Sequence, residues 1–352
     1  MTANDRSAGL HGRLEIVTLP APSLRGNPLG DPHVRPTPVY LPPQYDREPS
    51  RRFPVIYNLH GFTGSGFAHL NFQAWQPRSH ERLETAIEAG EVPPCIYVLV
   101  DGWSKLGGTQ YVNSSAIGNH FDYVTRDVTD HIDRTFRTIA HRDARAVMGK
   151  SSGGYGALVM AAFASDIFGL VADHSGDAGF TWCYLPDFPK TAEALRKAGG
   201  LRAWLEAFWE RARTKKPARE DGPIINIVAM AASYSPDPSA EMGIRLPFDL
   251  DTCALDEVVW RRWLERDPVS FIPRRLEAVR SLRLLYLDCG SRDDFNIQWG
   301  SRQLDRKLDE LGIAHVYEEF DDDHLNVQYR YERSFRAIGE RLRAALPVGA
   351  NG

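Results

Sequence analysis

Residues 144–162 read ARAVMGKSSGGYGALVMAA, and they contain the pattern G-x-S-x-G from Gly149 to Gly153. The apolar run before Gly149 is typical of a buried strand, and the small and apolar residues after Gly153 favour a helix. A sharp turn from a strand into a helix needs residues without a Cβ where the two segments meet, and the two glycines supply them. The pattern predicts a nucleophile elbow, with Ser151 as the candidate nucleophile and the amide of Ser152 at a helix start.

The same residues also match the end of a phosphate-binding loop, G-x-x-x-x-G-K-[ST]. That motif needs a glycine five residues before Gly149, where this chain has Ala144. The spacing excludes a phosphate-binding loop. It leaves the elbow and a purely structural Gly-Ser turn as the two interpretations.

The composition indicates an ordinary globular protein. The chain has 352 residues, 43% of them hydrophobic, and a net charge of -4 from 42 basic and 46 acidic side chains. Such a chain can bury a large core, but it lacks the positive excess that binds nucleic acid or anionic membranes. No run reaches the ~18 apolar residues of a membrane-spanning helix, and the start has no apolar signal segment. We expect a cytoplasmic protein with neither a nucleic-acid nor a membrane partner.

Cysteine spacing bears on metals and disulfides. The four cysteines are far apart and include no C-x-x-C pair: Cys95, Cys183, Cys253 and Cys289. This spacing favours reduced, packed thiols over a disulfide frame or a zinc site. We expect neither a metal nor another cofactor.

Short apolar runs alternate with longer segments of helical periodicity. This alternation predicts an α/β fold with a mostly parallel eight-stranded sheet flanked by helices. The expected strands are 14–18, 39–41, 55–59, 96–100, 144–148, 170–173, 282–287 and 315–319, the first two entering antiparallel at the sheet edge. The expected helices are 81–89, 121–136, 155–163, 303–311 and 331–345.

The alternation stops between residues 176 and 280, where helical pieces, turn clusters and prolines occur without a clear strand. We interpret 176–280 as an inserted, mainly helical cap on a catalytic domain formed by 1–175 and 281–352. Trp182 and Tyr184 lie soon after the strand expected at 170–173. We therefore expect them to line a substrate pocket.

A serine hydroxyl needs a base to take its proton and a carboxylate to orient that base. Residues 288–294 (DCGSRDD) and 321–324 (DDDH) follow the last two expected strands. The carboxyl ends of parallel strands share one edge, so both groups are expected beside Ser151. His324 is the expected base, with His174 as a rival. The expected acid is Asp293, and two neighbours on its loop remain as rivals: Asp288 and Asp294.

The second oxyanion amide in such a fold comes from the loop after an earlier strand. Here that loop begins His60-Gly61-Phe62. We expect the amide of Phe62 to face that of Ser152, with His60 and Gly61 beside the pocket. For Lys150, a structural ion pair and a substrate contact both stay open.

These motifs resemble the α/β-hydrolase esterases of the esterase D type, a group with S-formylglutathione hydrolases, feruloyl and enterochelin esterases and mycolyltransferases. The resemblance rests on residues 30–32 (GDP), 39–43 (VYLPP), 60–64 (HGFTG), 149–158 (GKSSGGYGAL), 290–293 (GSRD) and His324. It implies an α/β-hydrolase fold and these roles: Ser151 nucleophile, Asp293 acid, His324 base, Phe62 and Ser152 oxyanion amides. The chain departs from many relatives in having Lys150 and Ser152 within the elbow and in having a long cap.

Together these features predict a serine carboxylesterase that acts on a small-molecule ester through an acyl-enzyme intermediate. An acyltransferase with the same triad is one alternative. A non-catalytic binding protein on a hydrolase scaffold is another. The acyl group, the alcohol and assembly into a homo-oligomer are left open by the sequence.

Overall fold

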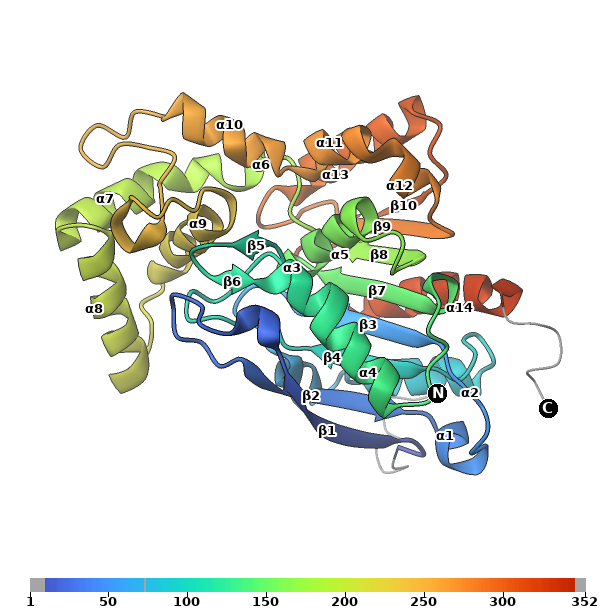
Figure 1. Ribbon diagram of the computed structural model, residues 1–352. Helices are drawn as coiled ribbons and strands as arrows, with labels where there is room; N and C mark the ends of the chain where they lie inside the picture. The colour runs from blue at the N-terminus through green and yellow to red at the C-terminus, as the bar shows by residue number, and fades with distance from the viewer. Residues whose placement is uncertain (1–9, 73, 346–352) are drawn as a thin grey trace.

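A computed structural model of the chain describes residues 10–72 and 74–345. Its centre is an eight-stranded sheet with strand order β1-β2-β4-β3-β7-β8-β9-β10 (Figure 1). The strands are β1 (Arg13–Pro20), β2 (Val34–Leu41), β3 (Val55–Leu59), β4 (Ile96–Val100), β7 (Arg145–Lys150), β8 (Leu170–His174), β9 (Leu284–Gly290) and β10 (Val316–Phe320). All neighbours from β4 to β10 pair in parallel, whereas β1 and β2 join the edge as antiparallel strands. The predicted fold class is therefore confirmed.

Alternating side chains of the central strands build two apolar layers. In β3, Val55, Tyr57 and Leu59 belong to one buried cluster and Ile56 to the other, as the twofold repeat of a strand requires. Helices α2 (Ser79–Glu88) and α14 (Tyr331–Ala345) cover the layer that contains Ile56. The opposite layer is covered by α4 (Thr129–Thr135), α5 (Ser152–Phe163) and α13 (Ile297–Glu310). Both faces of the parallel sheet are thus shielded from water.

Two local details differ from the sequence prediction. The helix expected at 121–136 consists of α3 (His120–Asp122), a π-helical segment Tyr123–Val128 and α4. A short hairpin of β5 (Asn113–Ser114) and β6 (Gly118–Asn119) was not predicted. Its strands have two residues each and are mostly polar, so they carry no periodic signal.

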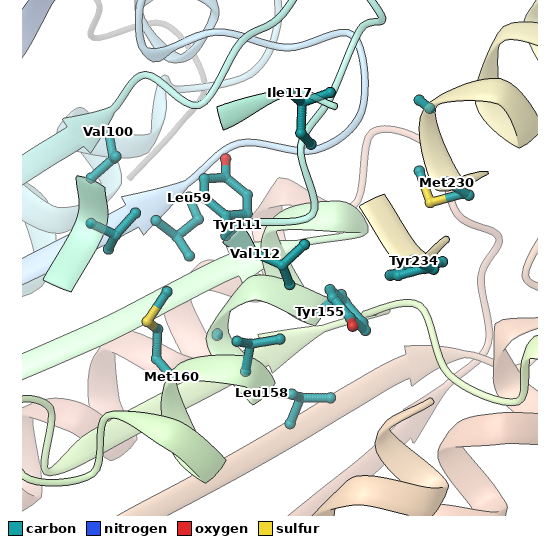
Figure 2. Packing of buried hydrophobic residues seen from close by; sticks show 14 of the residues in the cluster. Leu59, Val100, Tyr111, Val112, Ile117, Tyr155, Leu158, Met160, Met230 and Tyr234 are labelled. Carbon is teal, nitrogen blue, oxygen red and sulfur yellow. The ribbon is translucent and has the colours of Figure 1, made fainter. Parts of the chain in front are cut away.

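Residues 176–280 form the helices α6 (Phe180–Cys183), α7 (Phe188–Ala198), α8 (Leu201–Thr214), α9 (Asp221–Tyr234), α10 (Glu257–Glu265), α11 (Pro268–Phe271) and α12 (Leu276–Arg280). In Figure 1, α7, α8 and α9 lie together to one side of the sheet. Figure 2 shows Tyr155 of α5 beside Tyr234 of α9, and their ring centroids are 5.7 Å apart. Because one apolar cluster runs from the sheet into these helices, the division into cap and body stays a prediction.

All four cysteines are free thiols, and three of them are buried, in keeping with the predicted packed thiols. Within residues 10–72 and 74–345, no helix is long and apolar enough to cross a membrane.

The start of α5 is packed against the end of β3. A Cβ added at Gly153 would lie 2.0 Å from the carbonyl oxygen of Leu59. We expect Gly153→Ala to lower the free energy of unfolding by about 3 kcal/mol or more, because backbone must shift to admit the methyl group. Urea unfolding followed by circular dichroism measures the change.

Gly222→Ala is the matched control, because a Cβ at this position in the first turn of α9 meets no atom within 4 Å. It should leave stability unchanged or raise it by up to ~1 kcal/mol. Equal stabilities for Gly153→Ala and Gly222→Ala would contradict the close approach of α5 to β3.

Candidate active site

Six parallel strands, β4, β3, β7, β8, β9 and β10, bring their carboxyl ends to one edge of the sheet. The segments that follow them carry polar or catalytic candidates: Phe62 after β3, Ser151 after β7, Asp177 after β8, Asp293 after β9 and His324 after β10. The predicted site residues from distant parts of the sequence therefore share one edge, where α/β proteins bind their ligands.

Ser151 occupies a strained turn between β7 and α5. Its backbone has φ 59° and ψ -126°, a region that residues with a side chain seldom adopt. The amide of Ser151 donates a hydrogen bond to the carbonyl of His174 at 2.9 Å, which ties the turn to the end of β8. A Cβ at Gly149 would lie 2.4 Å from the carbonyl carbon of Gly153. The two glycines of the G-x-S-x-G pattern are therefore required by the geometry of the turn.

His324 and Asp293 form a buried pair. Nδ1 of His324 lies 2.6 Å from Oδ2 of Asp293. The other carboxylate oxygen accepts hydrogen bonds from the amides of Phe295 at 2.9 Å and Ile297 at 3.4 Å. The rival Asp294 instead accepts a hydrogen bond from the backbone amide of His324 at 3.2 Å. Of the two neighbours, Asp293 is the one that can orient the imidazole ring.

The two reactive atoms, Oγ of Ser151 and Nε2 of His324, have no hydrogen-bond partner among the described residues. Catalytic hydrogen bonds are often long in a protein without substrate and tighten in the Michaelis complex. Both atoms are thus left available for a substrate and for each other.

The loop after β3 passes directly beside the elbow. A Cβ on Gly61 would lie 3.3 Å from Cβ of Ser151, so no larger residue fits there without a shift of the neighbouring chain. Phe62 is the next residue of this loop, and Ser152 begins α5. The first amides of a helix have no partner within it, so that of Ser152 is free for an oxyanion.

His60 holds this loop in place. The amide of Gly102 donates to Nε2 of His60 at 2.8 Å, and Nδ1 lies 2.8 Å from the carbonyl of Gly61. A ring that accepts at Nε2 and donates at Nδ1 is neutral, and burial lowers the pKa of His60 in the same direction. The hydroxyl of Tyr111 also donates to the carbonyl of His60 at 2.8 Å. One ring nitrogen thus bonds its own loop, and the other accepts from Gly102 in the segment after β4.

The other rivals form a second Ser-His-Asp chain. Nδ1 of His174 lies 2.8 Å from Oδ1 of Asp288, and Nε2 of His174 lies 2.9 Å from Oγ of Ser334. All three side chains are at most 2% exposed, and Arg330 donates to the remaining oxygen of Asp288 at 3.0 Å. This chain contains the atoms of a triad but is closed to a substrate, so its role is structural.

The remaining pocket candidates differ in exposure. Trp182 on α6 is 50% exposed, whereas Tyr184 is buried and donates a hydrogen bond to Asp177 at 2.7 Å. Lys150 is partly buried, and its side chain has no ion pair or hydrogen bond with a described residue. Burial lowers the pKa of Lys150, while nearby carboxylates, Asp293 first among them, act in the opposite direction. Within residues 10–72 and 74–345, Lys150 therefore lacks the structural ion pair that was considered for it.

Sequence reasoning missed Asp177 and Gln110. Asp177 comes three residues after β8 ends at His174, so its place at the carboxyl edge was a usable signal. Gln110 belongs to the irregular segment after β4, and no pattern marks it. Its amide donates to Asp177 at 2.7 Å.

The two Ser-His-Asp chains lead to different expectations for Ser334 and Ser151. A fluorophosphonate should label wild type and Ser334→Ala equally, because Ser334 is fully buried, and it should not label Ser151→Ala. Ser334→Ala should lower the free energy of unfolding by about 1 to 2 kcal/mol, because it leaves Nε2 of His174 unpaired. Mass spectrometry of the adduct and thermal unfolding measure the two effects. Loss of labelling in Ser334→Ala would contradict this assignment.

Lys150 should reduce stability at neutral pH. Its folded pKa lies below the ordinary value of 10.5, so the unfolded chain holds this proton more tightly than the folded chain. Lys150→Met should therefore raise the free energy of unfolding at pH 7. The gain should shrink as pH rises through the interval between the folded pKa and 10.5. Denaturant unfolding at several pH values tests this, and a variant less stable than wild type at pH 7 would be the contrary result.

Comparisons with known proteins find esterases. A family model described as "Putative esterase" matches residues 33–335. Esterase Rv1288 of Mycobacterium tuberculosis is 30% identical over 213 residues, which cover 57% of this chain and 43% of that protein. The match thus spans less than half the length of this relative.

Solved structures share the architecture. A ferulic acid esterase superposes with a TM-score of 0.61 at 17% identity, covering 95% of this chain and 100% of the other. An S-formylglutathione hydrolase from Agrobacterium tumefaciens gives a TM-score of 0.56 at 16% identity, covering 95% of this chain and 97% of the other. At these identities the structures establish a common fold. Because the family model spans most of its length, the chain belongs to the family described as "Putative esterase", and it has the α/β-hydrolase fold.

Proposed function

We propose that the chain is a serine carboxylesterase that hydrolyses small-molecule esters through an acyl-enzyme on Ser151. The observation that carries the proposal is the buried pair of His324 and Asp293, 2.6 Å apart, at the sheet edge where Ser151 stands on a strained elbow. A base oriented by a fixed carboxylate is what a serine hydroxyl needs in order to react.

In the first half of the reaction, Oγ of Ser151 attacks the ester carbonyl carbon and Nε2 of His324 accepts the hydroxyl proton. The carboxylate of Asp293 keeps the other ring proton on Nδ1 and stabilises the imidazolium that forms. Asp293 is itself held by the amides of Phe295 and Ile297. The base therefore needs little reorganisation when charge develops.

Charge on the carbonyl oxygen is stabilised by the amides of Phe62 and Ser152. Collapse of the tetrahedral intermediate breaks the ester bond, and the imidazolium returns its proton to the departing alcohol. Water then attacks the acyl-enzyme with His324 again as base, which releases the acid and restores Ser151. Every proton is carried by these residues, the substrate or water.

Turnover of p-nitrophenyl acetate provides the test. Ser151→Ala should lower kcat by about 10⁶, the scale seen when a triad nucleophile is removed. Asp293→Asn should lower it by about 10⁴, because an amide favours the wrong imidazole tautomer. Released p-nitrophenol is measured spectrophotometrically.

The matched serine control is Ser334→Ala, whose side chain is fully buried and pairs with His174 rather than His324, and whose turnover should match wild type. Substantial hydrolysis by purified Ser151→Ala, checked by mass spectrometry for wild-type contamination, would refute the nucleophile assignment.

A further inference from the structure

A buried polar cluster lies beside the proposed triad, and some of its acceptor atoms have no hydrogen-bond donor. We call it the Asp177 cluster, and it consists of Gln110, Asp177, Tyr184 and Tyr234. Oδ2 of Asp177 accepts hydrogen bonds from Nε2 of Gln110 and from the hydroxyl of Tyr184, each at 2.7 Å. Nε2 of Gln110 also donates to the hydroxyl of Tyr234 at 2.9 Å. The donors of the cluster therefore converge on one oxygen of one carboxylate.

Contacts of neighbouring residues place this cluster close to both the Phe62 loop and the start of α5. Gln110 precedes Tyr111, whose hydroxyl holds the carbonyl of His60 at the start of the Phe62 loop. On the other side, a Cβ on Gly154 in the first turn of α5 would lie 2.9 Å from Cα of Gly176, the residue before Asp177. The chain at Asp177 thus runs alongside the turn that carries Ser151. Electrostatic coupling of Asp177 to His324 is consistent with this position.

Two acceptor atoms in the cluster lack a donor. Gln110 is fully buried, and its Oε1 is enclosed without a hydrogen-bond partner. Asp177 is 7% exposed. Its Oδ1 accepts no hydrogen bond from a described residue, and unlike Oε1 of Gln110 it is not enclosed by protein atoms. The enclosed Oε1 of Gln110 is costly because it has no donor. Oδ1 of Asp177 is the acceptor of the two that is not enclosed, and unpaired acceptors in native proteins normally serve a ligand or an ordered water.

The charges nearby favour a neutral donor. Burial raises the pKa of Asp177, and the ammonium of Lys150 is close enough to interact with its carboxylate. A second cation at the cluster would be repelled by Lys150, whereas a hydroxyl group can donate a hydrogen bond without adding charge.

We infer that the Asp177 cluster is a substrate subsite, which binds a free hydroxyl group near the scissile ester through Oδ1 of Asp177. The preferred substrates would then be esters of hydroxy acids or monoesters of polyols. This inference rests on the proposed esterase function. Because only a hydroxylated ester fills the subsite, the subsite should raise kcat/KM for hydroxylated esters relative to esters without the hydroxyl group.

Two pairs of esters separate the acyl side from the alcohol side. Ethyl 3-hydroxybutyrate is compared with ethyl butyrate, and 2-hydroxyethyl acetate with ethyl acetate, by pH-stat measurement of kcat/KM. Wild type should prefer the hydroxylated member of at least one pair. Asp177→Asn should reduce that preference by about 10- to 100-fold, because its amide can keep accepting from Gln110 and Tyr184 while an NH₂ group replaces the free acceptor.

Asp130→Asn is the matched control, since Asp130 is exposed on α4, and its preference should equal that of wild type. Tyr184→Phe is a second variant that keeps the carboxylate but removes one of its hydrogen bonds. It should reduce the preference by about fivefold, and it serves if Asp177→Asn fails to fold.

The outcomes are distinguishable. Turnover of all four esters without a hydroxyl preference in wild type would overturn the subsite and leave the esterase intact. An equal loss on both members of a pair in Asp177→Asn would also overturn it, since it would make Asp177 a positioning residue for His324. No turnover of any ester by wild type would refute the proposed function and the subsite with it.

Discussion

The close approach of α5 to the end of β3 is the contact on which the carboxyl edge of the sheet depends. At Gly153 the backbone of the helix comes so near the carbonyl of Leu59 that no side chain fits. This contact forces the turn at Ser151 into its strained conformation, and it brings the loop after β3 against the nucleophile. The strain is sustained by the packed sheet and by the hydrogen bond to His174 rather than by local preference.

Burial separates two chemically identical arrangements in this fold. One Ser-His-Asp chain, from Ser334 to Asp288, is enclosed between α14 and the sheet and is completed by Arg330. In the other, only the pair of His324 and Asp293 is closed by hydrogen bonds, while Oγ of Ser151 and Nε2 of His324 are left without a protein partner among the described residues. A fully satisfied polar network stabilises a fold. A reactive site, in contrast, needs polar atoms that form their hydrogen bonds only when the substrate is bound.

Two polar groups near the proposed triad illustrate how function can conflict with stability. Lys150 is partly buried without an ion pair in the described part of the chain, and Gln110 keeps an enclosed acceptor without a donor. Folding alone would favour apolar side chains at such positions. Both groups lie at the sheet edge that carries Ser151, Asp293 and His324, and departures from the rules of folding stability are expected at functional sites.

The amino-acid sequence by itself determined the strand-helix alternation, the elbow and the order Ser, Asp, His. These are local signals: periodicity reports which face is buried, and glycines report where a chain must turn or approach another. The sequence did not predict the π-helical segment or the two-residue strands of the hairpin. Elements this short produce no recognisable periodicity of apolar residues. Only the tertiary structure shows that Asp293 pairs with His324 and Asp288 with His174, because these partners lie on different segments, 31 and 114 residues apart in the sequence. The same holds for Asp177 and Gln110, which are 67 residues apart and meet only where β4 and β8 end at one edge of the folded sheet.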